Sequence, residues 1–434
     1  MKESNPKLLD QEFKVVLDQL ENTGEHYFVT GRAGTGKSTL LSLFYKTTNK
    51  RTVIVAPTGI AALNVGGQTI HSFFRFPPRM IQPEDIVKLK NHWLYKKLEV
   101  LIIDEISMVR ADMLDNIDRF LRVNRDIDLP FGGVQLICFG DLFQLPPVLS
   151  SGFERNYFKT QYSSPYFFSA KVVEDQGIDI KMIELNKVYR QTEKFFVKLL
   201  DRIRTRTFDR EDLELLNEQF EPSEENDHLI ICLCSLNATA NAINQEESNA
   251  LTSSSHYFQA TVKGSFQSRL YPTKEVLEIK EGAQVMFVKN DPAKRFVNGT
   301  LGKVLRVDQG VIFVEILDGE QTKVIELEKM DWEILRYKLD EARDNRFTTE
   351  VVGSFTQFPI KLAWAITIHK SQGKTFDNIK IDLGKGAFEF GQTYVALSRC
   401  RTLGGIQLLN KIRPRDIMVD PMIVDFYETK SRYW

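Results

Sequence analysis

The segment from Gly31 to Ser38 constrains the fold of this chain most. It reads Gly31-Arg-Ala-Gly-Thr-Gly36-Lys37-Ser38 and fits the pattern G-x-x-x-x-G-K-[S/T], between an apolar β-rich run and an apolar helical pattern. Glycines at these positions let backbone N–H groups close around phosphate oxygens at a helix N-terminus, where the helix dipole favours anions. The sequence therefore predicts a phosphate-binding loop between a strand and a helix.

Short apolar runs recur through the first 190 residues, with helical patterns between them. The runs are His26–Thr30, Thr52–Ala56, Val100–Asp104, Gln135–Gly140 and Met182–Leu185, and the clearest helical patterns are Thr39–Thr47 and Ala111–Val123. Apolar runs of this length are typical of buried parallel strands. Their alternation with helices predicts an α/β fold with a parallel sheet covered on both faces.

The character of the sequence changes twice after residue 190. Residues 251–355 hold short strands separated by Asn-Gly, Asp-Gln-Gly and Asp-Gly-Glu turns, which favour a small antiparallel barrel. The α/β pattern precedes this module at 191–250 and returns at 356–434. We therefore expect a first lobe over 1–190 with a small insertion at about 66–90, and a second lobe into which the β module is inserted.

Composition excludes several classes of protein. Lys plus Arg is 57 and Asp plus Glu is 58, so the chain is neither a polycation nor an acidic tail protein, although a basic groove can exist within a neutral total. The sequence has no run of about 18 apolar residues, which a membrane span would need, and no apolar N-terminal stretch of the kind found in signal peptides. The four cysteines are too few and too scattered for a disulfide framework. We expect a protein of a reducing compartment, with buried thiols.

Two further strands end in polar side chains suited to nucleotide hydrolysis. The run Val100–Ile103 leads into Asp104 and Glu105, which suit a Mg²⁺ contact and the base that orients an attacking water, respectively. In the phosphate loop, Lys37 would reach the β and γ phosphates and Ser38 would ligate Mg²⁺. Gln144 follows a third strand; its amide could contact a γ phosphate and a water, or it could be an ordinary loop glutamine.

The segment His71-Ser-Phe-Phe-Arg-Phe-Pro-Pro-Arg79 combines aromatic and basic residues. Phe73 and Phe76 would suit base stacking and the arginines phosphate contact, or the whole segment could form a wedge at a duplex fork. The alternative is an ordinary apolar loop that packs on the lobe. Composition does not decide between them.

Seven segments in a fixed order resemble a known family. They are Gly31–Ser38, Ala56-Pro-Thr-Gly-Ile-Ala-Ala62, Asp104-Glu105-Ile-Ser, Gly140-Asp-Leu-Phe-Gln144, Val188-Tyr-Arg190-Gln, Thr367-Ile-His369-Lys-Ser-Gln-Gly373 and Tyr394-Val-Ala-Leu-Ser-Arg399. They resemble the helicase motifs of superfamily one, group B, and within it the petite-integration-frequency (PIF-type) DNA helicases. The resemblance runs from about residue 8 to residue 430.

The resemblance implies two RecA-like lobes with ATP between them, and a Src-homology-three-like β-barrel inserted in the second. It implies that Gln11 reads adenine and that Arg190 and Arg399 are arginine fingers. The implied nucleotide contacts are Gly31, Ala33, Gly34, Thr35, Gly36, Lys37, Ser38, Thr39 and Gly373, and the implied contacts to the DNA backbone are Thr58, Gly59, Thr69, His71, His369 and Ser371.

The function that the resemblance implies is an ATP- and Mg²⁺-dependent DNA helicase that moves 5′-to-3′ on single-stranded DNA. The expected substrates are single strands and duplex or G-quadruplex junctions, with no membrane partner, and the free protein is expected to be a monomer. A bare core of this kind suggests a bacterial cytoplasmic protein, or a nuclear or mitochondrial one if it is a fragment of a eukaryotic helicase.

Three alternatives stay open at this point. An RNA helicase would use the same motor, because selectivity for RNA depends on 2′-OH contacts that the sequence does not reveal. A 3′-to-5′ motor would normally carry large insertions in both lobes, whereas little chain separates Ala62 from Val100. A nucleotide-gated single-strand-binding protein or translocase without unwinding activity is the third, although a pure binder has no need of the base Glu105.

Overall fold

The structure is a computed structural model that describes residues 10–149, 151–220, 229–318, 321–340 and 346–431. Residues 1–9, at the start of the expected first lobe, and residues 432–434, at the end of the expected second lobe, lie outside the described residues. The chain forms two compact units. Unit 1 comprises residues 1–189, 334–352 and 421–434, and unit 2 comprises residues 190–333 and 353–420.

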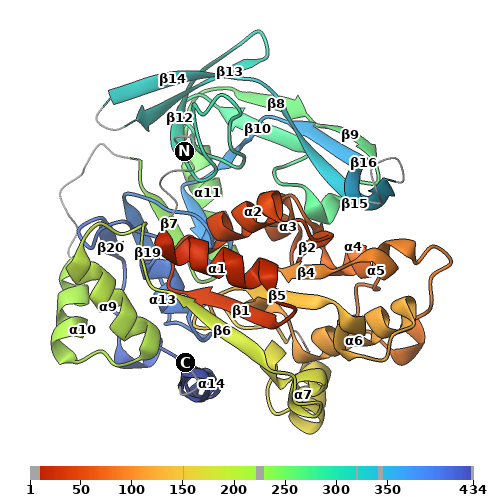
Figure 1. Ribbon diagram of the computed structural model, residues 1–434. Coiled ribbons are helices and arrows are strands. Elements are labelled where there is room, and N and C mark those ends of the chain that lie inside the picture. Colours follow the sequence, from red (N-terminus) through yellow and green to blue (C-terminus); the bar gives the residue numbers. More distant parts are fainter. Residues whose placement is uncertain (1–9, 150, 221–228, 319–320, 341–345, 432–434) are drawn as a thin grey trace. The chain divides into compact units, whose positions relative to one another are not determined.

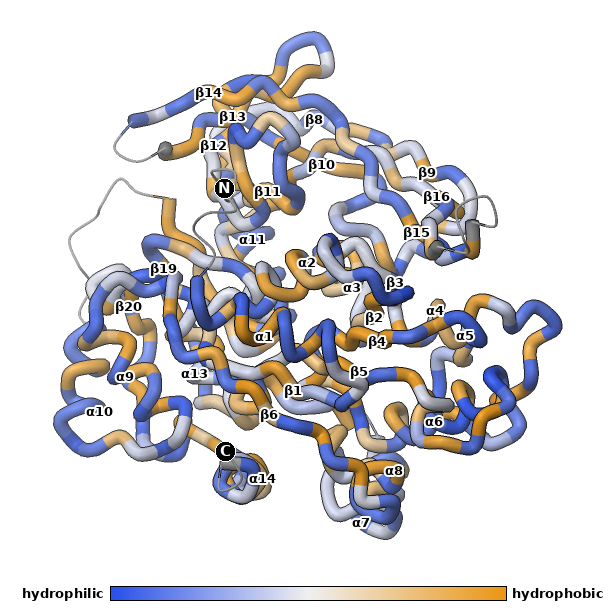
Figure 2. Tube along the Cα trace, in the orientation of Figure 1, coloured by the Kyte–Doolittle hydropathy of each residue, from blue (hydrophilic) through white to orange (hydrophobic). Residues whose placement is uncertain are grey.

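Unit 1 is built on a six-stranded sheet in which every neighbouring pair of strands is parallel. Its order is β3-β2-β4-β5-β1-β6. The strands are β1 (His26–Gly31), β2 (Thr52–Ala56), β3 (Gln68–Thr69), β4 (Val100–Ile103), β5 (Gln135–Phe139) and β6 (Ile180–Leu185). The predicted parallel sheet is confirmed, and Figure 2 shows β4 and β5 as hydrophobic stretches of the chain.

Helices cover both faces of this sheet (Figure 1). The helices α1 (Gln11–Asn22) and α2 (Lys37–Thr47) pack on one face, where Phe13, Leu40 and Phe44 join the side chains of β1, β4 and β5 in one apolar core. The amphipathic helix α6 (Ala111–Arg125) lies on the other side. The remaining short helices of the segment before residue 190 are α3 (Gly59–Val65), α4 (Ile70–Phe74), α5 (Trp93–Lys97), α7 (Gly152–Gln161) and α8 (Lys171–Glu174).

Two segments from distant parts of the sequence belong to unit 1. Tyr337, on the hairpin of β15 (Met330–Asp340) and β16 (Arg346–Gln357), accepts a hydrogen bond from the Ile54 backbone N–H at 3.2 Å. The C-terminal helix α14 (Pro421–Ser431) contacts β1 through Tyr427. From the sequence we expect residues up to 355 in the β module and residues 421–434 in the second lobe. Nothing in the local sequence pattern marks the long-range packing that brings 334–352 and 421–434 to unit 1.

Unit 2 has its own parallel sheet of four strands, in the order β18-β7-β19-β20. The strands are β7 (Ile231–Cys234), β18 (Ala365–Thr367), β19 (Ile379–Asp382) and β20 (Ile406–Leu408), and the helices are α9 (Lys194–Thr205), α10 (Arg210–Asn217), α11 (Asn237–Ala250), α12 (Ile368–Ser371) and α13 (Gln392–Leu397). The predicted return of the α/β pattern after residue 356 is therefore confirmed.

The segment between α11 and β18 is predominantly antiparallel sheet. The strands β11 (Gln284–Phe287), β12 (Leu301–Asp308), β13 (Val311–Asp318), β14 (Gln321–Leu327) and β17 (Ile360–Leu362) form a five-stranded sheet, and β8 (Ser255–Gln259), β9 (Thr261–Gly264) and β10 (Val276–Lys280) form smaller sheets. Alternate side chains such as Ile312, Val314 and Ile316 of β13 fill its core. The Src-homology-three-like barrel stays a prediction.

Neither disulfides nor membrane-spanning helices are found in the described ranges. All four cysteines are free and buried, as expected. None of the helices described for this chain has both the length and the apolar character needed to cross a membrane.

Candidate functional site

Three polar segments meet at one edge of the sheet in unit 1. The phosphate loop follows β1, the pair Asp104-Glu105 follows β4, and the segment from Asp141 to Gln144 follows β5. Because β5 lies between β1 and β4 and all three strands are parallel, their carboxyl ends point to the same side. Ligands of open α/β sheets bind outside such carboxyl ends.

The phosphate loop has the backbone conformation that its glycines predict. Gly34 and Gly36 have φ values of 83° and 84°, in the left-handed region that favours glycine. A Cβ atom on Gly36 would lie 3.0 Å from the ring of Phe13, and one on Gly31 would lie 2.7 Å from the Leu185 carbonyl oxygen. At Gly31 and Gly36 the loop therefore has little room for a side chain.

The side chains of the loop divide between its interior and its open face. Ala33 and Thr35 are buried, and the Thr35 hydroxyl donates to the Arg32 carbonyl oxygen at 3.0 Å. Ser38 and Thr39 are exposed in the first turn of α2, where the helix dipole favours an anion. This arrangement leaves the Ser38 hydroxyl accessible to a cation beside a bound phosphate.

Lys37 holds its ammonium group over the loop. Its Nζ atom donates to the carbonyl oxygens of Gly31 at 2.6 Å and Arg32 at 3.0 Å. These two acceptors are main-chain carbonyl oxygens, and an anionic phosphate oxygen would be a stronger acceptor for the ammonium group.

The carboxylate pair after β4 lies in an unfavourable electrostatic environment. Asp104 is 9% exposed, and burial raises the pKa of its carboxyl to about 7, with a further contribution from repulsion by Glu105. A backbone N–H and the charge of Lys37 partly oppose this rise in pKa. Glu105 itself has a φ of 51°, a left-handed conformation that is strained for a residue with a side chain. Such strain is typical of functional positions.

Gln144 is held by its own turn. It is buried, its backbone N–H donates to the Asp141 carbonyl oxygen at 3.0 Å, and its Nε2 atom donates to the Asp141 carboxylate at 3.3 Å. The amide is therefore oriented at the end of β5. This position is compatible with a contact between the Gln144 amide and a γ phosphate, which stays a prediction.

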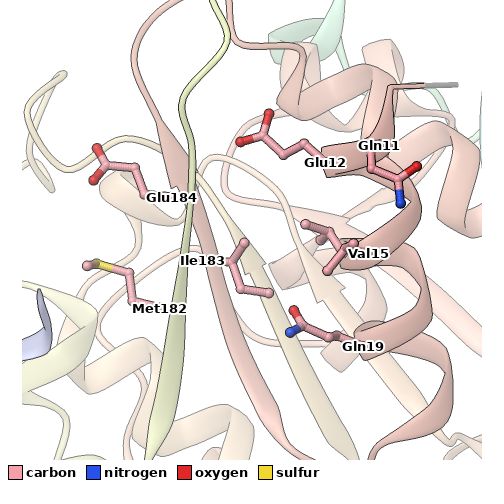
Figure 3. Close-up of a pocket in the computed structure, with 8 residues that line it drawn as sticks. Gln11, Glu12, Val15, Gln19, Met182, Ile183 and Glu184 are labelled. Atoms are coloured by element: carbon pink, nitrogen blue, oxygen red, sulfur yellow. The ribbon is translucent and has the colours of Figure 1, made fainter. Parts of the chain in front are cut away.

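The phosphate loop lies between two neighbouring segments, the start of α1 and the residues around Tyr189. The Tyr189 N–H donates to the Gly34 carbonyl oxygen at 2.8 Å, and its hydroxyl donates to Asp10 at 2.8 Å. Gln11 lines a groove of about 470 Å³ between α1 and β6, in which Val15 and Ile183 face each other (Figure 3). The groove offers the amides of Gln11 and Gln19 and apolar side walls, which suit a flat heteroaromatic ring, and the carboxylates of Glu12 and Glu184 complete its lining.

The residues at this edge fit a magnesium-bound nucleoside triphosphate. Mg²⁺ is usually held by one or two protein oxygens together with phosphates and waters. The hydroxyl of Ser38 and the carboxylate of Asp104 supply such a pair. No denser cluster of metal-ligating side chains occurs among the residues that the structure describes.

The candidate strand-binding residues of unit 1 lie at helix N-termini. The hydroxyls of Thr58 and Thr69 cap α3 and α4 by accepting the N–H groups of Ala61 and Ser72, each at 3.2 Å. Gly59 begins α3, and His71 is half-buried in α4. Helix N-termini present unpaired N–H groups, which suit phosphate contact.

Phe73 and Phe76 are placed in the interior rather than on the surface. They are only 4% and 5% exposed, and Phe73 makes edge-to-face contacts with Tyr95 and Tyr337, while Phe76 stacks on Phe74. Buried rings cannot stack on bases. The structure thus supports the alternative weighed from the sequence, an aromatic segment that packs on its own lobe, and corrects the expectation of DNA contact for these two rings.

The two candidate arginine fingers belong to unit 2. Arg190 is half-buried, donates to the Ser398 carbonyl oxygen at 3.2 Å, and has its pKa lowered to about 10 by burial. Arg399 is 1% exposed, and its guanidinium donates to the Val395 carbonyl oxygen at 2.9 Å and to the Ser398 hydroxyl at 2.7 Å. Both guanidinium groups therefore bind the end of α13 here.

The remaining candidates of unit 2 lie on and after α12. His369 contacts the Glu389 carboxylate through Nε2 at 2.9 Å. Ser371 is fully buried, and its hydroxyl donates to the Ile368 carbonyl oxygen at 2.7 Å, so that this hydroxyl is used within the helix. Gly373 is exposed with a φ of 74°.

One contact of the phosphate-loop strand has no signal in the sequence. The Tyr427 hydroxyl lies 2.6 Å from the Thr30 hydroxyl, immediately before Gly31, and its ring centroid lies 4.9 Å from that of Phe143, immediately before Gln144. Only the long-range fold brings α14 to these positions.

Comparison with known proteins gives consistent matches. The family model described as PIF1-like helicase matches residues 8–212. The ATP-dependent DNA helicase Pif1 of Bdellovibrio bacteriovorus is 32% identical over 97% of this chain and 92% of its own length. The corresponding Xenopus laevis helicase is 34% identical, but the chain spans only 62% of its length.

Solved structures resemble the whole chain. A Bacteroides sp. Pif1 structure in complex with ADP-AlF4 is 38% identical over 98% of both chains, with a TM-score of 0.89. A Bacteroides Pif1 structure bound to single-stranded DNA is 39% identical over 97% of both chains, with a TM-score of 0.70.

Proposed function

The chain belongs to the PIF1-like helicase family, and on this premise we propose that it is an ATP-dependent DNA helicase that moves 5′-to-3′ on single-stranded DNA. Its substrates would be single strands and duplex or G-quadruplex junctions, and its compartment the bacterial cytoplasm. The observation that carries this proposal is the meeting of the phosphate loop, the Asp104-Glu105 pair and Gln144 at one sheet edge.

In this proposal unit 1 binds the nucleotide. The N–H groups of the loop and Lys37 hold the phosphates, Ser38 and Asp104 hold Mg²⁺, and Gln11 contacts the adenine. When bound, Mg²⁺ neutralises part of the phosphate charge. The raised pKa of Asp104 supports the assignment, because a cation would stabilise the charged form of this buried carboxylate beside Glu105.

Glu105 and Gln144 would orient the water that attacks the γ phosphate. Glu105 would accept the proton of that water, and its carboxylate does not cap the helical turn that begins at Ile106. Gln144 would donate its amide to phosphate or water from a fixed orientation. Both roles depend on positioning rather than on an unusual chemical group.

Arg190 and Arg399 are proposed as the arginine fingers that stabilise charge on the transferring phosphoryl group. Both guanidinium groups donate to neutral oxygen atoms, and an anionic phosphate oxygen would be a stronger acceptor. We place the backbone of the DNA strand against Thr58, Gly59, Thr69 and His71 of unit 1 and His369 of unit 2, with Gly373 toward the nucleotide and Ser371 as support for its helix.

ATP turnover in the presence of oligonucleotides tests this function. We expect hydrolysis that single-stranded DNA stimulates more than RNA of the same sequence, and loss of that hydrolysis in Lys37→Ala with much of the single-strand affinity retained. Lys46→Ala, an exposed lysine in the last turn of the same helix, is the matched control. Stronger stimulation by RNA would point to an RNA helicase, and undiminished hydrolysis in Lys37→Ala would refute the site.

A further inference from the structure

Three lysines from two segments lie near one another in unit 2, and two of them, Lys361 and Lys374, lie at one end of β11. Lys361 on β17 pairs with Met286 of β11, and the next residue, Phe287, exchanges backbone hydrogen bonds with Gly299 and Thr300, each at 2.9 Å. The loop that contains Gly299 therefore folds back beside this end of β11. Lys374, which follows α12, lies against the same loop.

Lys374 packs closely on this loop. Its Nζ atom donates to the Asn298 side-chain oxygen at 2.5 Å. A Cβ atom on Gly299 would lie only 3.6 Å from the Lys374 side chain, so the lysine stem rests directly on the glycine. Lys370, four residues earlier, donates to the Asn237 side-chain oxygen at 3.1 Å.

None of these three ammonium groups has a carboxylate partner in the part of the chain that the structure describes. The acceptors of Lys370 and Lys374 are neutral amides, and the half-buried Lys361 makes no hydrogen bond or ion pair there. The nearby carboxylate of Glu389 contacts His369 instead. The cluster is therefore an uncompensated positive charge.

The charges affect one another. Burial lowers the pKa of Lys361 to about 7, and repulsion from Lys374 and Lys370 adds to this effect. Burial alone lowers the pKa of Lys374 to about 8. A partly desolvated cation without an ion-pair partner destabilises the free protein, whereas the attraction of an anion that enters the cluster would offset the costs of desolvation and repulsion.

We propose that Lys361, Lys370 and Lys374, together with the Asn298 amide, bind a phosphodiester group of the DNA strand. The inference deepens the proposed function, on which it rests. Lysines bind phosphate as point charges. The cluster offers separate positive charges rather than a row of backbone N–H groups of the kind that binds a polyphosphate. The phosphate loop before α2 already provides such a row. A strand phosphate is thus the better fit.

Neutralising variants of the full chain test this site. In Lys361→Met and Lys374→Met we expect the Kd for a fluorescent oligothymidine to rise about tenfold, as for loss of a charge-assisted hydrogen bond. The slope of log Kd against log salt should fall by about 0.7 for each lost phosphate contact. Lys323→Met, an exposed lysine on β14, serves as control and should leave the slope unchanged.

Thermal stability and nucleotide affinity complete the test. If Lys361 serves to bind an anion, Lys361→Met should raise the Tm of the DNA-free protein. If Lys361 has a structural role, the same substitution should lower the Tm. A raised Tm with unchanged DNA affinity and salt slope would overturn the proposal. Weaker binding of ATP alone, with DNA affinity intact, would assign the cluster to a nucleotide phosphate and overturn it too.

The test separates this inference from the function on which it rests. A wild-type protein that binds single-stranded DNA without hydrolysing ATP would contradict the helicase function, yet the lysine variants would still report on the strand site. Conversely, intact hydrolysis with unaltered DNA binding in both lysine variants would refute the strand site alone.

Discussion

The hydroxyl of Tyr427 lies 2.6 Å from the hydroxyl of Thr30, although 397 residues separate them along the chain. Thr30 is the residue before the phosphate loop, and the Tyr427 ring also contacts Phe143, the residue before Gln144. A single side chain of the C-terminal helix therefore contacts the residues next to two parts of the proposed nucleotide site, the phosphate loop and Gln144.

Removing this support should weaken both stability and turnover. Tyr427→Phe leaves the buried Thr30 hydroxyl without its partner, and we expect the free energy of unfolding to fall by about 1 kcal/mol. The KM for ATP should rise because the loop loses a fixed end. A double-mutant cycle with Thr30→Val, followed by denaturant unfolding, should give a coupling energy close to the whole single-mutant effect. Additive effects would contradict a direct contact.

Glu105 should show opposite effects on stability and activity. Glu105→Gln removes the proposed proton acceptor, so ATP turnover should fall by about 10²-fold or more while ATP binding is retained. Glu105→Gly also relieves the left-handed strain and should raise the free energy of unfolding by about 1 kcal/mol. Calorimetry and single-turnover hydrolysis measure the two effects. A Gln variant with normal turnover would remove Glu105 from the mechanism.

The segments of the candidate site could be predicted from the sequence because each of them is local. Gly31–Ser38 fixes its own turn, and the apolar runs before Asp104 and Gln144 identify buried strands whose ends lie at one edge. The conformation of such a segment is determined by residues that are close together in the sequence. The order of β1, β4 and β5 in the sheet needed the structure.

The positions that sequence reasoning missed all depend on distant parts of the chain. The burial of Phe73 requires Tyr337, the support of Thr30 requires Tyr427, and the approach of Lys361 to Lys374 requires the pairing of β11 with β17. An aromatic and basic composition does not tell which rings face inward. Side-chain direction is set by tertiary packing, which no local pattern near these residues encodes.

The aromatic cluster around Phe73 should matter for stability and not for DNA contact. We expect Phe73→Ala to lower the free energy of unfolding by about 3–5 kcal/mol, since it leaves a cavity among Tyr95, Phe74 and Tyr337. The milder Phe73→Leu should keep the fold and leave the Kd for single-stranded DNA within twofold of wild type. A large loss of DNA affinity in a folded Phe73→Leu protein would restore the stacking role.

His26 should make the stability of the protein sensitive to mild acid. Its Nδ1 atom accepts the Leu136 N–H at 3.0 Å, and burial lowers its pKa below the usual 6.5. Well above pH 6.5 both states are largely deprotonated at His26. As the pH falls from 6.5 toward the folded pKa, the unfolded state takes up the proton first, so stability is lost.

The variant His26→Gln isolates this effect, because its amide oxygen can still accept the Leu136 N–H. Chemical unfolding at pH 7.5 and pH 5.5 should show a greater loss of stability in wild type than in His26→Gln. An equal loss in the two proteins would show that His26 is not the titrating group.

Strand separation on tailed duplexes tests the central claim most directly. One DNA duplex is prepared with either a 5′ or a 3′ single-stranded tail and mixed with the protein, ATP and Mg²⁺. The proposed function predicts unwinding of the 5′-tailed duplex, dependent on ATP and absent in Lys37→Ala, and no unwinding of the 3′-tailed one. Preference for the 3′ tail would contradict the polarity, and unwinding of neither, with DNA-stimulated hydrolysis intact, would contradict the helicase itself.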